Sequence, residues 1–287
     1  AYSGSSFSWT NYSTSSSSQG GMGGMGMDSG NTDKGDYSTK GLKAANSITI
    51  VSGTINIEAY DDAIHANAAT DIESGVTGKG NVTISGGTVT VSSNDDGIHG
   101  DGTLTISGGT VTVKTAYEGI EANQIYFNGG STYVYATNDA VNAASCEQTT
   151  TPCIYISDGF IDLDCASGDT DTLDSNGNIK MTGGVIVIKN RSSQASSQTG
   201  GTIDIDGTFT MSGGLLLSFG TWCTEVNLTA TKSSTSSVSS GTYTVKDSSG
   251  NTICTTTLST SYAGYRIVSK LSGSYTLYNG STSVTTF

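Results

Sequence analysis

Carboxylate side chains recur in this 287-residue chain at fixed places relative to a repeated apolar residue. When the segments DDAIHA, DDGIHG and YEGIEA are aligned, Asp62, Asp96 and Glu118 fall in one column, and Asp61 and Asp95 fall in the column before it. Carboxylates stacked as neighbours repel one another unless a cation neutralises them. Ca²⁺ accepts about six to eight oxygen ligands in a flexible geometry. The columns therefore predict a calcium site.

The predicted calcium ligands belong to two groups. The preferred site takes the acidic residues of three successive repeats: Asp61, Asp62, Asp95, Asp96, Asp101, Glu118 and Glu121. A second site takes Asp139, Asp169, Asp171 and Asp174. Asx-turns at the corners of the repeats are the alternative, and they account for single Asn residues but not for doubled aspartates. His65 and His99 share a column that is compatible with a transition-metal site, although hydrogen-bonded surface histidines are more common.

These side chains are positioned by an internal repeat. The apolar residue that anchors each unit recurs after 22, 34, 22, 21, 32 and 30 residues, at Leu42, Ile64, Ile98, Ile120, Val141, Leu173 and Ile203. Each unit contains two short alternating strands joined by a Ser-Gly-Gly corner, such as residues 104–106 and 111–113. One unit cannot bury its apolar face alone, but units stacked about 4.8 Å apart form a continuous core. The pattern predicts an all-β chain whose residues 36–221 form a right-handed parallel β-helix of about seven coils.

The corner glycines and the two flanks complete the predicted organisation. The second glycine of each corner is expected at positive φ, where a Cβ would clash; these glycines are Gly53, Gly87, Gly109, Gly130, Gly159, Gly184 and Gly214. Residues 1–35 are rich in Ser, Gly and Met, and we expect them to cap the helix or to join neighbouring subunits. Residues 222–287 lose the repeat and are expected to form a small antiparallel β-hairpin region.

Charge and cysteine content limit the classes of function. Twelve Lys and Arg oppose 25 Asp and Glu, for a net charge of −13, which argues against nucleic acid as a partner. No apolar run reaches the roughly 18 residues of a membrane span. We expect a secreted, extracellular or cell-surface protein. Five cysteines admit disulfides such as Cys146–Cys153 and Cys223–Cys254, with Cys165 left over, although connectivity cannot be deduced from sequence.

The repeat resembles a known family. The strings YEGIEANQI, DDGIHGDGTLTISGGTVTV and DSNGNIKMTGG are similar to those of secreted bacterial β-helix proteins called carbohydrate-binding-domain proteins, which resemble the pectate lyase superfamily in fold. The resemblance covers roughly residues 36–221 and extends more loosely to the C-terminal hairpins. It implies calcium in the helix and binding of plant-wall polysaccharide, with acidic polymers held through cation bridges. This chain differs in its five cysteines and its Met-Gly-rich N-terminal segment.

Three functions are compatible with these features. The first is a non-catalytic protein that binds a cellulose- or pectin-like polysaccharide, with outward tyrosines on two adjacent coils as a flat stacking platform: Tyr126, Tyr133, Tyr135 and Tyr155. Tyrosine is also a common strand residue without any ligand. The second is a structural subunit that assembles with copies of itself into a filament or surface layer. The third is a calcium-dependent polysaccharide lyase, for which Lys40, Lys43 and Lys79 are the candidate bases.

Overall fold

The protein is described by a computed structural model that places residues 39–68, 77–146, 148–168, 170–191, 201–223 and 226–287. The described residues form 22 β-strands and no helix, which confirms the prediction of an all-β chain. None of them belongs to a helix that could cross a bilayer. The predicted segment 1–35 lies outside the described residues.

Most strands belong to one 18-stranded sheet built from three parallel ladders. The first ladder contains β1 (Leu42–Ala44), β4 (Ile64–Ala66), the start of β7 (Ile98–Thr115), the start of β8 (Ile120–Ala136), β9 (Val141–Ala143), β11 (Asp171–Ser175) and β14 (Gly201–Ile205). The second contains β2 (Ser47–Ile50), β5 (Asn81–Ile84), the middle of β7 and β8, the start of β10 (Cys153–Cys165), β12 (Asn178–Met181) and β15 (Phe209–Met211). The third contains β3 (Thr54–Glu58), β6 (Thr88–Ser92), the ends of β7, β8 and β10, β13 (Val185–Lys189) and β16 (Leu215–Phe219).

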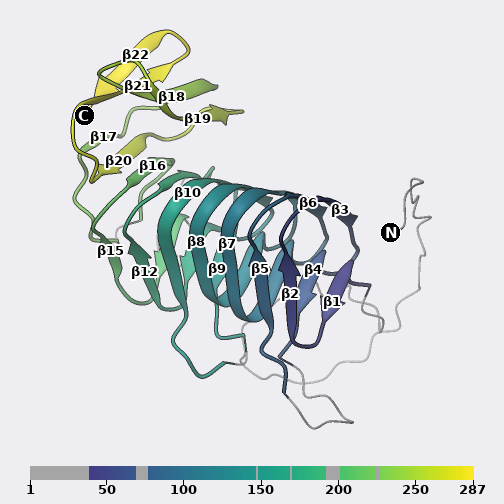
Figure 1. The fold of residues 1–287 in the computed structure, drawn as a ribbon. Coiled ribbons are helices and arrows are strands. Elements are labelled where there is room, and N and C mark those ends of the chain that lie inside the picture. The colour runs from purple at the N-terminus through teal and green to yellow at the C-terminus, as the bar shows by residue number, and fades with distance from the viewer. Residues whose placement is uncertain (1–38, 69–76, 147, 169, 192–200, 224–225) are drawn as a thin grey trace.

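The register of the first ladder matches the repeat found in the sequence. Leu42 pairs with Ile64, and the remaining anchors pair in the predicted order through to Ile203. All seven predicted corner glycines have positive φ. Figure 1 shows the strands of successive repeats side by side along one axis. The spacing of the apolar anchors therefore predicted which residues become neighbours.

The core lies between the three ladders. Strands such as β5 alternate between buried and half-buried residues, because side chains of a strand point to opposite faces. Ile98, Leu104, Ile106 and Val111 come from all three sides of one repeat, and none of them is exposed. Inward-pointing Ile, Val and Leu thus form one continuous apolar column.

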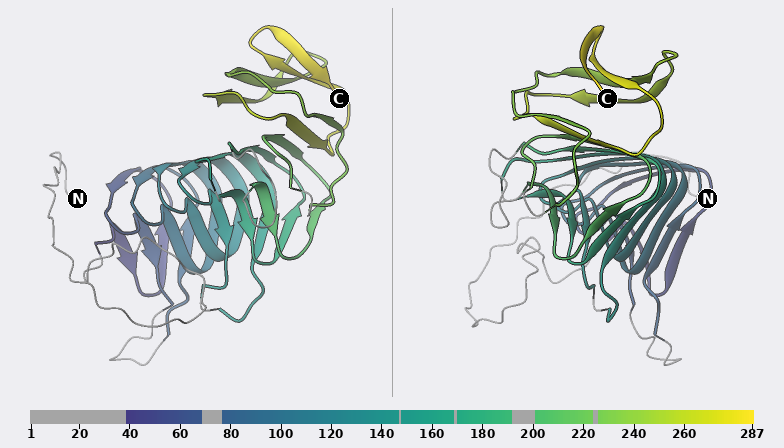
Figure 2. Two further views of the ribbon diagram at one scale, coloured as in Figure 1. Left: turned by 180° about the vertical axis from the view of Figure 1, so that it is seen from behind. Right: turned by 90° about the vertical axis from the view of Figure 1, so that its left-hand side faces the viewer.

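A C-terminal antiparallel region covers one end of the third ladder. Strand β20 (Tyr265–Ser269) pairs antiparallel with β16 and with β17 (Lys232–Ser234). A separate four-stranded sheet has the order β19 (Thr252–Leu258), β18 (Gly241–Asp247), β21 (Tyr275–Asn279) and β22 (Thr282–Thr286). Figure 2 shows these strands at the end of the stack that carries β16. Strand β16 is apolar at nearly every position because both of its faces are buried.

The expected disulfides are absent. All five cysteines lie in the described part of the chain, and none of them forms a disulfide. Cys146 lies beside His99, whereas Cys153 is buried at the start of β10. Cys223 packs in the core of the stack, and Cys254 packs in the second apolar cluster beneath the C-terminal sheet. The pairing of Cys146 with Cys153, and of Cys223 with Cys254, was therefore wrong because each pair is divided between different packing environments.

Candidate functional site

The first ladder carries a column of polar side chains that point away from the core. Parallel strands in register place equivalent residues of successive repeats about 4.8 Å apart. The column directly after the apolar anchors runs, in register, through Lys43, His65, His99, Glu121, Asn142, Asp174 and Asp204. The sequence spacing that defined the repeat thus brings together residues more than 20 positions apart.

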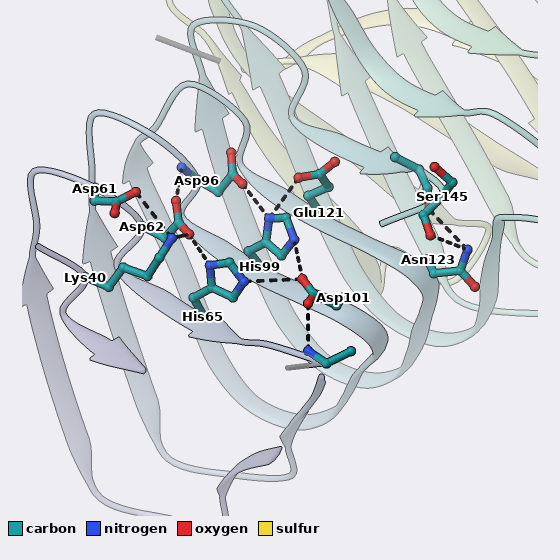
Figure 3. Close-up of polar contacts among 12 residues, drawn as sticks. Lys40, Asp61, Asp62, His65, Asp96, His99, Asp101, Glu121, Asn123 and Ser145 are labelled. Atoms are coloured by element: carbon teal, nitrogen blue, oxygen red, sulfur yellow. Dashed lines mark hydrogen bonds and ion pairs between the residues drawn. The ribbon is translucent and has the colours of Figure 1, made fainter. Parts of the chain in front are cut away.

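Six of the seven residues predicted for the preferred calcium site form two compact groups. Carboxylate oxygens of Asp61, Asp62 and Asp95 lie within 4.8 Å of one another. The second group, with the same separation, consists of Asp96, Glu118 and Glu121. Figure 3 shows Asp61, Asp62, Asp96 and Glu121 in one row along successive repeats. The row offers only oxygen ligands, which suits a hard divalent cation.

One cationic side chain neutralises part of this row. Lys40, which precedes β1, contacts Asp62 and lies 3.3 Å from the Asp61 carboxylate. Its ammonium group is thereby held as a counter-ion of the two aspartates. No other Lys or Arg of the described residues forms an ion pair with Asp61, Asp62, Asp96, Glu118 or Glu121. Lys40 therefore offsets negative charge in the first group, and no Lys or Arg of the described residues forms an ion pair with the second group.

Two of the three carboxyl groups in the second group have pKa values above their usual range. Burial raises the pKa of Asp96 to about 7 against the hydrogen bond from His99, and the charges of Glu121 and Asp62 raise it further. Burial also raises the pKa of Glu118 well above its usual value, and Glu121, Asp96 and Asp139 contribute in the same direction. Burial and neighbouring negative charges both favour the protonated form of these two carboxyl groups. The pKa of Glu121 is lowered despite its burial, because His99 stabilises its carboxylate through a hydrogen bond.

Two histidines lie between this row and Asp101. The rings of His65 and His99 stack with centroids 4.3 Å apart. Their Nε2 atoms lie 3.3 and 3.2 Å from the same atom, Asp101 Oδ1. Oδ2 of Asp101 accepts a hydrogen bond of 2.7 Å from the backbone N–H of Ala68. Asp101, the seventh predicted calcium ligand, therefore faces the histidines and not the row (Figure 3).

The other imidazole nitrogens face the row. His65 Nδ1 contacts Asp62, and His99 Nδ1 lies 2.7 Å from Asp96 and 2.9 Å from Glu121. Burial would lower the pKa of His99, but hydrogen bonds to Asp101, Asp96, Cys146 and Glu121 raise it well above its usual value. The pKa of Asp62 is lowered despite its burial, because His65 and Lys40 stabilise the carboxylate.

The second predicted site is partly brought together. Asp139 accepts a hydrogen bond of 2.7 Å from the backbone N–H of Asp171. Burial raises the pKa of Asp174 to about 8, with further contributions from the charges of Asp139, Asp204, Asp171 and Asp206. Asp169 lies outside the described residues. Asp204 and Asp206 were not in the predicted set, although their places in the repeat columns could have identified them.

The four predicted tyrosines lie on two different ladders. Tyr126 and Tyr155 pair in register on the second ladder, with centroids 4.4 Å apart and ring planes inclined by only 3°. Rings that close lie face to face, so they present edges and hydroxyl groups to solvent instead of a flat platform. Lys180 follows in the same column, with its Nζ 5.3 Å from the Tyr155 ring. Because the repeat register places Lys180 next to Tyr155, the sequence spacing could have identified Lys180 as a further candidate binding residue.

The other two tyrosines belong to the third ladder. Tyr133 packs edge-on against Phe160 with centroids 5.8 Å apart, and it remains 39% exposed. Tyr135 lies under the guanidinium group of Arg191, which is 5.7 Å from its ring. Tyr133 is therefore the predicted tyrosine whose ring is most open to a ligand.

Comparison with known proteins gives one family. No curated protein and no solved structure matches the chain. A family model described as carbohydrate-binding domain-containing protein matches residues 8–77 and 76–257. The match includes the first ladder, the four tyrosines, β17, β18 and nearly all of β19, and it ends before β20. The chain therefore belongs to the family of carbohydrate-binding domain-containing proteins.

Proposed function

We propose that this protein is a non-catalytic, calcium-stabilised protein that binds cell-wall or acidic polysaccharide outside the cell. The observation that carries the proposal is the family match, which spans residues 8–257. The three parallel ladders support a right-handed parallel β-helix of about seven coils, of the pectate lyase-like kind, as the scaffold. A rigid scaffold of this kind can present the same side chains at a constant interval to a polymer.

Calcium is proposed at the two carboxylate groups of the first ladder. Five of their six residues are buried and Glu121 is half-buried, and one Lys lies beside them. Asn142 adds an unused oxygen ligand. Its Nδ2 donates to Glu118 over 3.0 Å, while its buried Oδ1 has no hydrogen-bond partner among the described residues. An orphaned amide oxygen beside the second group of carboxylates fits the ligand preference of Ca²⁺.

Polysaccharide is proposed to bind on the outward faces of the second and third ladders. Tyr133 offers an exposed ring for sugar stacking, held in orientation by Phe160. Tyr126 and Tyr155 offer hydroxyl groups, and Lys180 offers a cation for the carboxylate of an acidic sugar. These groups supply apolar contact, hydrogen bonds and charge, which are the components of a carbohydrate site.

Retention on insoluble cellulose and on calcium pectate, with calcium and with EDTA, tests this proposal. We expect the wild-type protein to be retained and Tyr133→Ala to bind about 2- to 10-fold more weakly, as expected for loss of one aromatic contact. Tyr155→Phe, which removes only the hydroxyl group, should weaken binding by a similar factor through loss of a hydrogen bond. Tyr278→Ala is the matched control, because Tyr278 lies in the C-terminal sheet. Absence of retention on every polymer under both conditions would refute the binding function.

A structural subunit of a filament is the second candidate. Strands β1, β2 and β3 each pair with only one other strand among the described residues, so their outer edges are uncovered there. The opposite end of the third ladder is covered by β20. An uncovered edge can pair with a strand of another chain. This asymmetry between the two ends favours head-to-tail association.

A further inference from the structure

We propose that Lys189 and Asp162 form an intramolecular amide bond, in which Lys189 Nζ is joined to Asp162 Cγ with loss of one water molecule. Asp164 is the carboxylate that carries a proton during this reaction. The bond joins strand β13 to strand β10, its neighbour in the third ladder. It requires neither calcium nor polysaccharide.

The first argument is the contact between the amine and the carboxyl group. Lys189 Nζ lies 2.6 Å from Asp162 Oδ1, yet this oxygen accepts no hydrogen bond within the described residues, so the contact is not aligned as one. Because a C–O bond measures about 1.2 Å, the nitrogen lies at most about 3.8 Å from Cγ. Reacting groups held about 3–3.5 Å apart are already close to the geometry of attack. The fold therefore holds the amine beside the carbon that it would attack.

The second argument is the burial of both reacting groups. The side chains of Lys189 and Asp162 are each only 9% exposed. Asp162 pairs in register with Val187, which belongs to the apolar cluster beneath the C-terminal sheet. Separated charges are costly away from water, so transfer of one proton to give a neutral amine and a carboxylic acid is easier here than in solution. Exclusion of water also protects the amide from hydrolysis.

The third argument is the hydrogen bond at the other oxygen of Asp162. The hydroxyl group of Thr256, on strand β19, donates to Asp162 Oδ2 over 2.8 Å. A donor at a carboxyl oxygen stabilises the negative charge that develops there when a nucleophile attacks the carbon. Oδ2 is thus the oxygen that remains as the amide carbonyl, and Oδ1 is the oxygen that leaves as water. The docked C-terminal sheet completes the site, because β19 belongs to that sheet.

The fourth argument is a second carboxylate within reach. Asp164 follows Asp162 by two residues on β10 and pairs in register with Lys189. Its Oδ2 accepts a hydrogen bond of 2.7 Å from Arg191, while its Oδ1 is buried and has no hydrogen-bond partner in the described part of the chain. Burial raises the pKa of Asp164, although the charges of Lys189 and Arg191 oppose this effect. A carboxylate with a higher pKa is a stronger base, so Asp164 is suited to accept a proton from the amine.

The reaction balances without any further reactant. One proton passes from the Lys189 ammonium group to Asp162, and the lone pair of the resulting amine attacks Cγ. The nitrogen then gives a second proton to Asp164, which passes it to the departing oxygen of Asp162. The C–O bond breaks and one water molecule leaves. Asp164 ends in its original ionised form.

Mass spectrometry of the reduced and denatured protein tests the proposal. We expect the intact mass to be lower than the mass of the sequence by one water molecule. Trypsin does not cleave after a lysine whose amine is part of an amide. The digest should therefore contain residues 115–180 joined to residues 181–191, instead of separate peptides 115–180 and 181–189.

Three variants assign the bond to the proposed residues. Lys189→Arg should keep the full mass of its sequence, because a guanidinium group does not replace the amine in this reaction. Asp164→Asn leaves the amine and the Asp162 carboxyl group in place, and it should slow joining by about 100-fold, as expected for loss of a general base. Lys180→Arg is the matched control, because Lys180 is an exposed lysine of the neighbouring strand β12. It should be joined to the same extent as the wild type.

The wild-type protein alone decides whether the bond exists, so the outcome does not depend on the folding of a variant. A wild-type mass equal to that of the sequence would overturn the proposal. Loss of water without the joined peptide, as from cyclisation at an Asp-Gly step, would overturn it too. Joining in Lys180→Arg but not in Lys189→Arg supports it. Joining of Asp164→Asn at the wild-type rate would overturn the role of Asp164 as proton carrier.

Discussion

At the residue scale, acidic residues at equivalent positions of successive repeats concentrate negative charge on one ladder. Register places the acidic residues of successive repeats next to one another, and burial removes the water that would screen them. Asp96 and Asp174 consequently have pKa values of about 7 and about 8. These carboxyl groups hold protons that the unfolded chain would have released, so the folded state binds more protons than the unfolded state.

Asp174→Asn should reduce the pH dependence of stability measured in EDTA. The carboxyl group has an ordinary pKa of 3.8 and a folded pKa of about 8. The free energy of unfolding should therefore fall as pH rises from about 4 to about 8. The stabilisation that comes from the protonated Asp174 is complete only below the pKa of the unfolded chain. The amide that replaces the carboxyl group cannot ionise, so the variant should melt at a higher temperature at about pH 8, by about 2–4 °C for each kcal/mol relieved.

Calorimetric melting of both proteins across this pH range is the measurement. In the wild type, calcium should abolish most of the fall in unfolding free energy with rising pH, because a bound cation stabilises the ionised carboxylates. Glu58→Gln, which changes an acidic residue of β3, is the control. Parallel pH profiles for wild type and Asp174→Asn would show that Asp174 does not keep its proton in the folded state.

At the element scale, the corners depend on glycine for two separable reasons. Gly109 has φ of +81°, and a Cβ there would lie 2.5 Å from the carbonyl oxygen of Gly87 in the preceding repeat. Gly53 has φ of +96°, but a Cβ there would meet nothing within 4 Å because it lies in the first corner. Backbone strain is thus common to both positions, and the clash with a stacked neighbour occurs only at Gly109.

Alanine at these two positions should separate strain from stacking. Gly53→Ala should cost about 1–2 kcal/mol, the strain of a left-handed conformation with a Cβ. Gly109→Ala should cost about 1–3 kcal/mol more, because the neighbouring corner must shift. Urea unfolding, compared by the midpoint at constant m-value, measures both. Equal losses at the two positions would mean that successive corners are not in close contact.

At the scale of the whole molecule, the two ends of the stack differ. Strand β20 covers β16, and the C-terminal sheet buries Leu215, Leu217 and Phe219 beside it. At the other end Val51 is 65% exposed and Leu42 is 37% exposed. Apolar side chains beside strand edges that no other described strand covers favour association with another chain.

Val51→Lys should weaken self-association if the structural candidate is correct. A lysine at a sheet edge opposes edge-to-edge pairing through its charge and hydration. Sedimentation velocity over a range of concentrations and negative-stain microscopy would measure assembly, with Thr255→Lys in the C-terminal sheet as the control. A wild-type protein that stays monomeric at every concentration would eliminate the filament candidate and leave polysaccharide binding.

Much of the fold could be predicted because an internal repeat shows which residues, far apart in the sequence, pair in neighbouring strands. The anchors from Leu42 to Ile203 predicted each in-register pair of the first ladder, and the second glycine of each corner was predicted at positive φ. Six of the seven preferred carboxylates lie in two groups, where the sequence had suggested one site. Equivalent positions in a parallel stack are neighbours by construction, so counting residues was sufficient.

What the sequence alone determined is therefore which residues share a column, and the tertiary structure decided what each column faces. Tyr126 and Tyr155 stack face to face because strand spacing is narrower than an aromatic ring, so register alone could not show a flat platform. Asp101 turns toward His65 and His99, and Cys223 and Cys254 lie in two different apolar clusters. These outcomes depend on side-chain direction and on contacts between regions without a shared period, and neither is encoded in spacing along the chain.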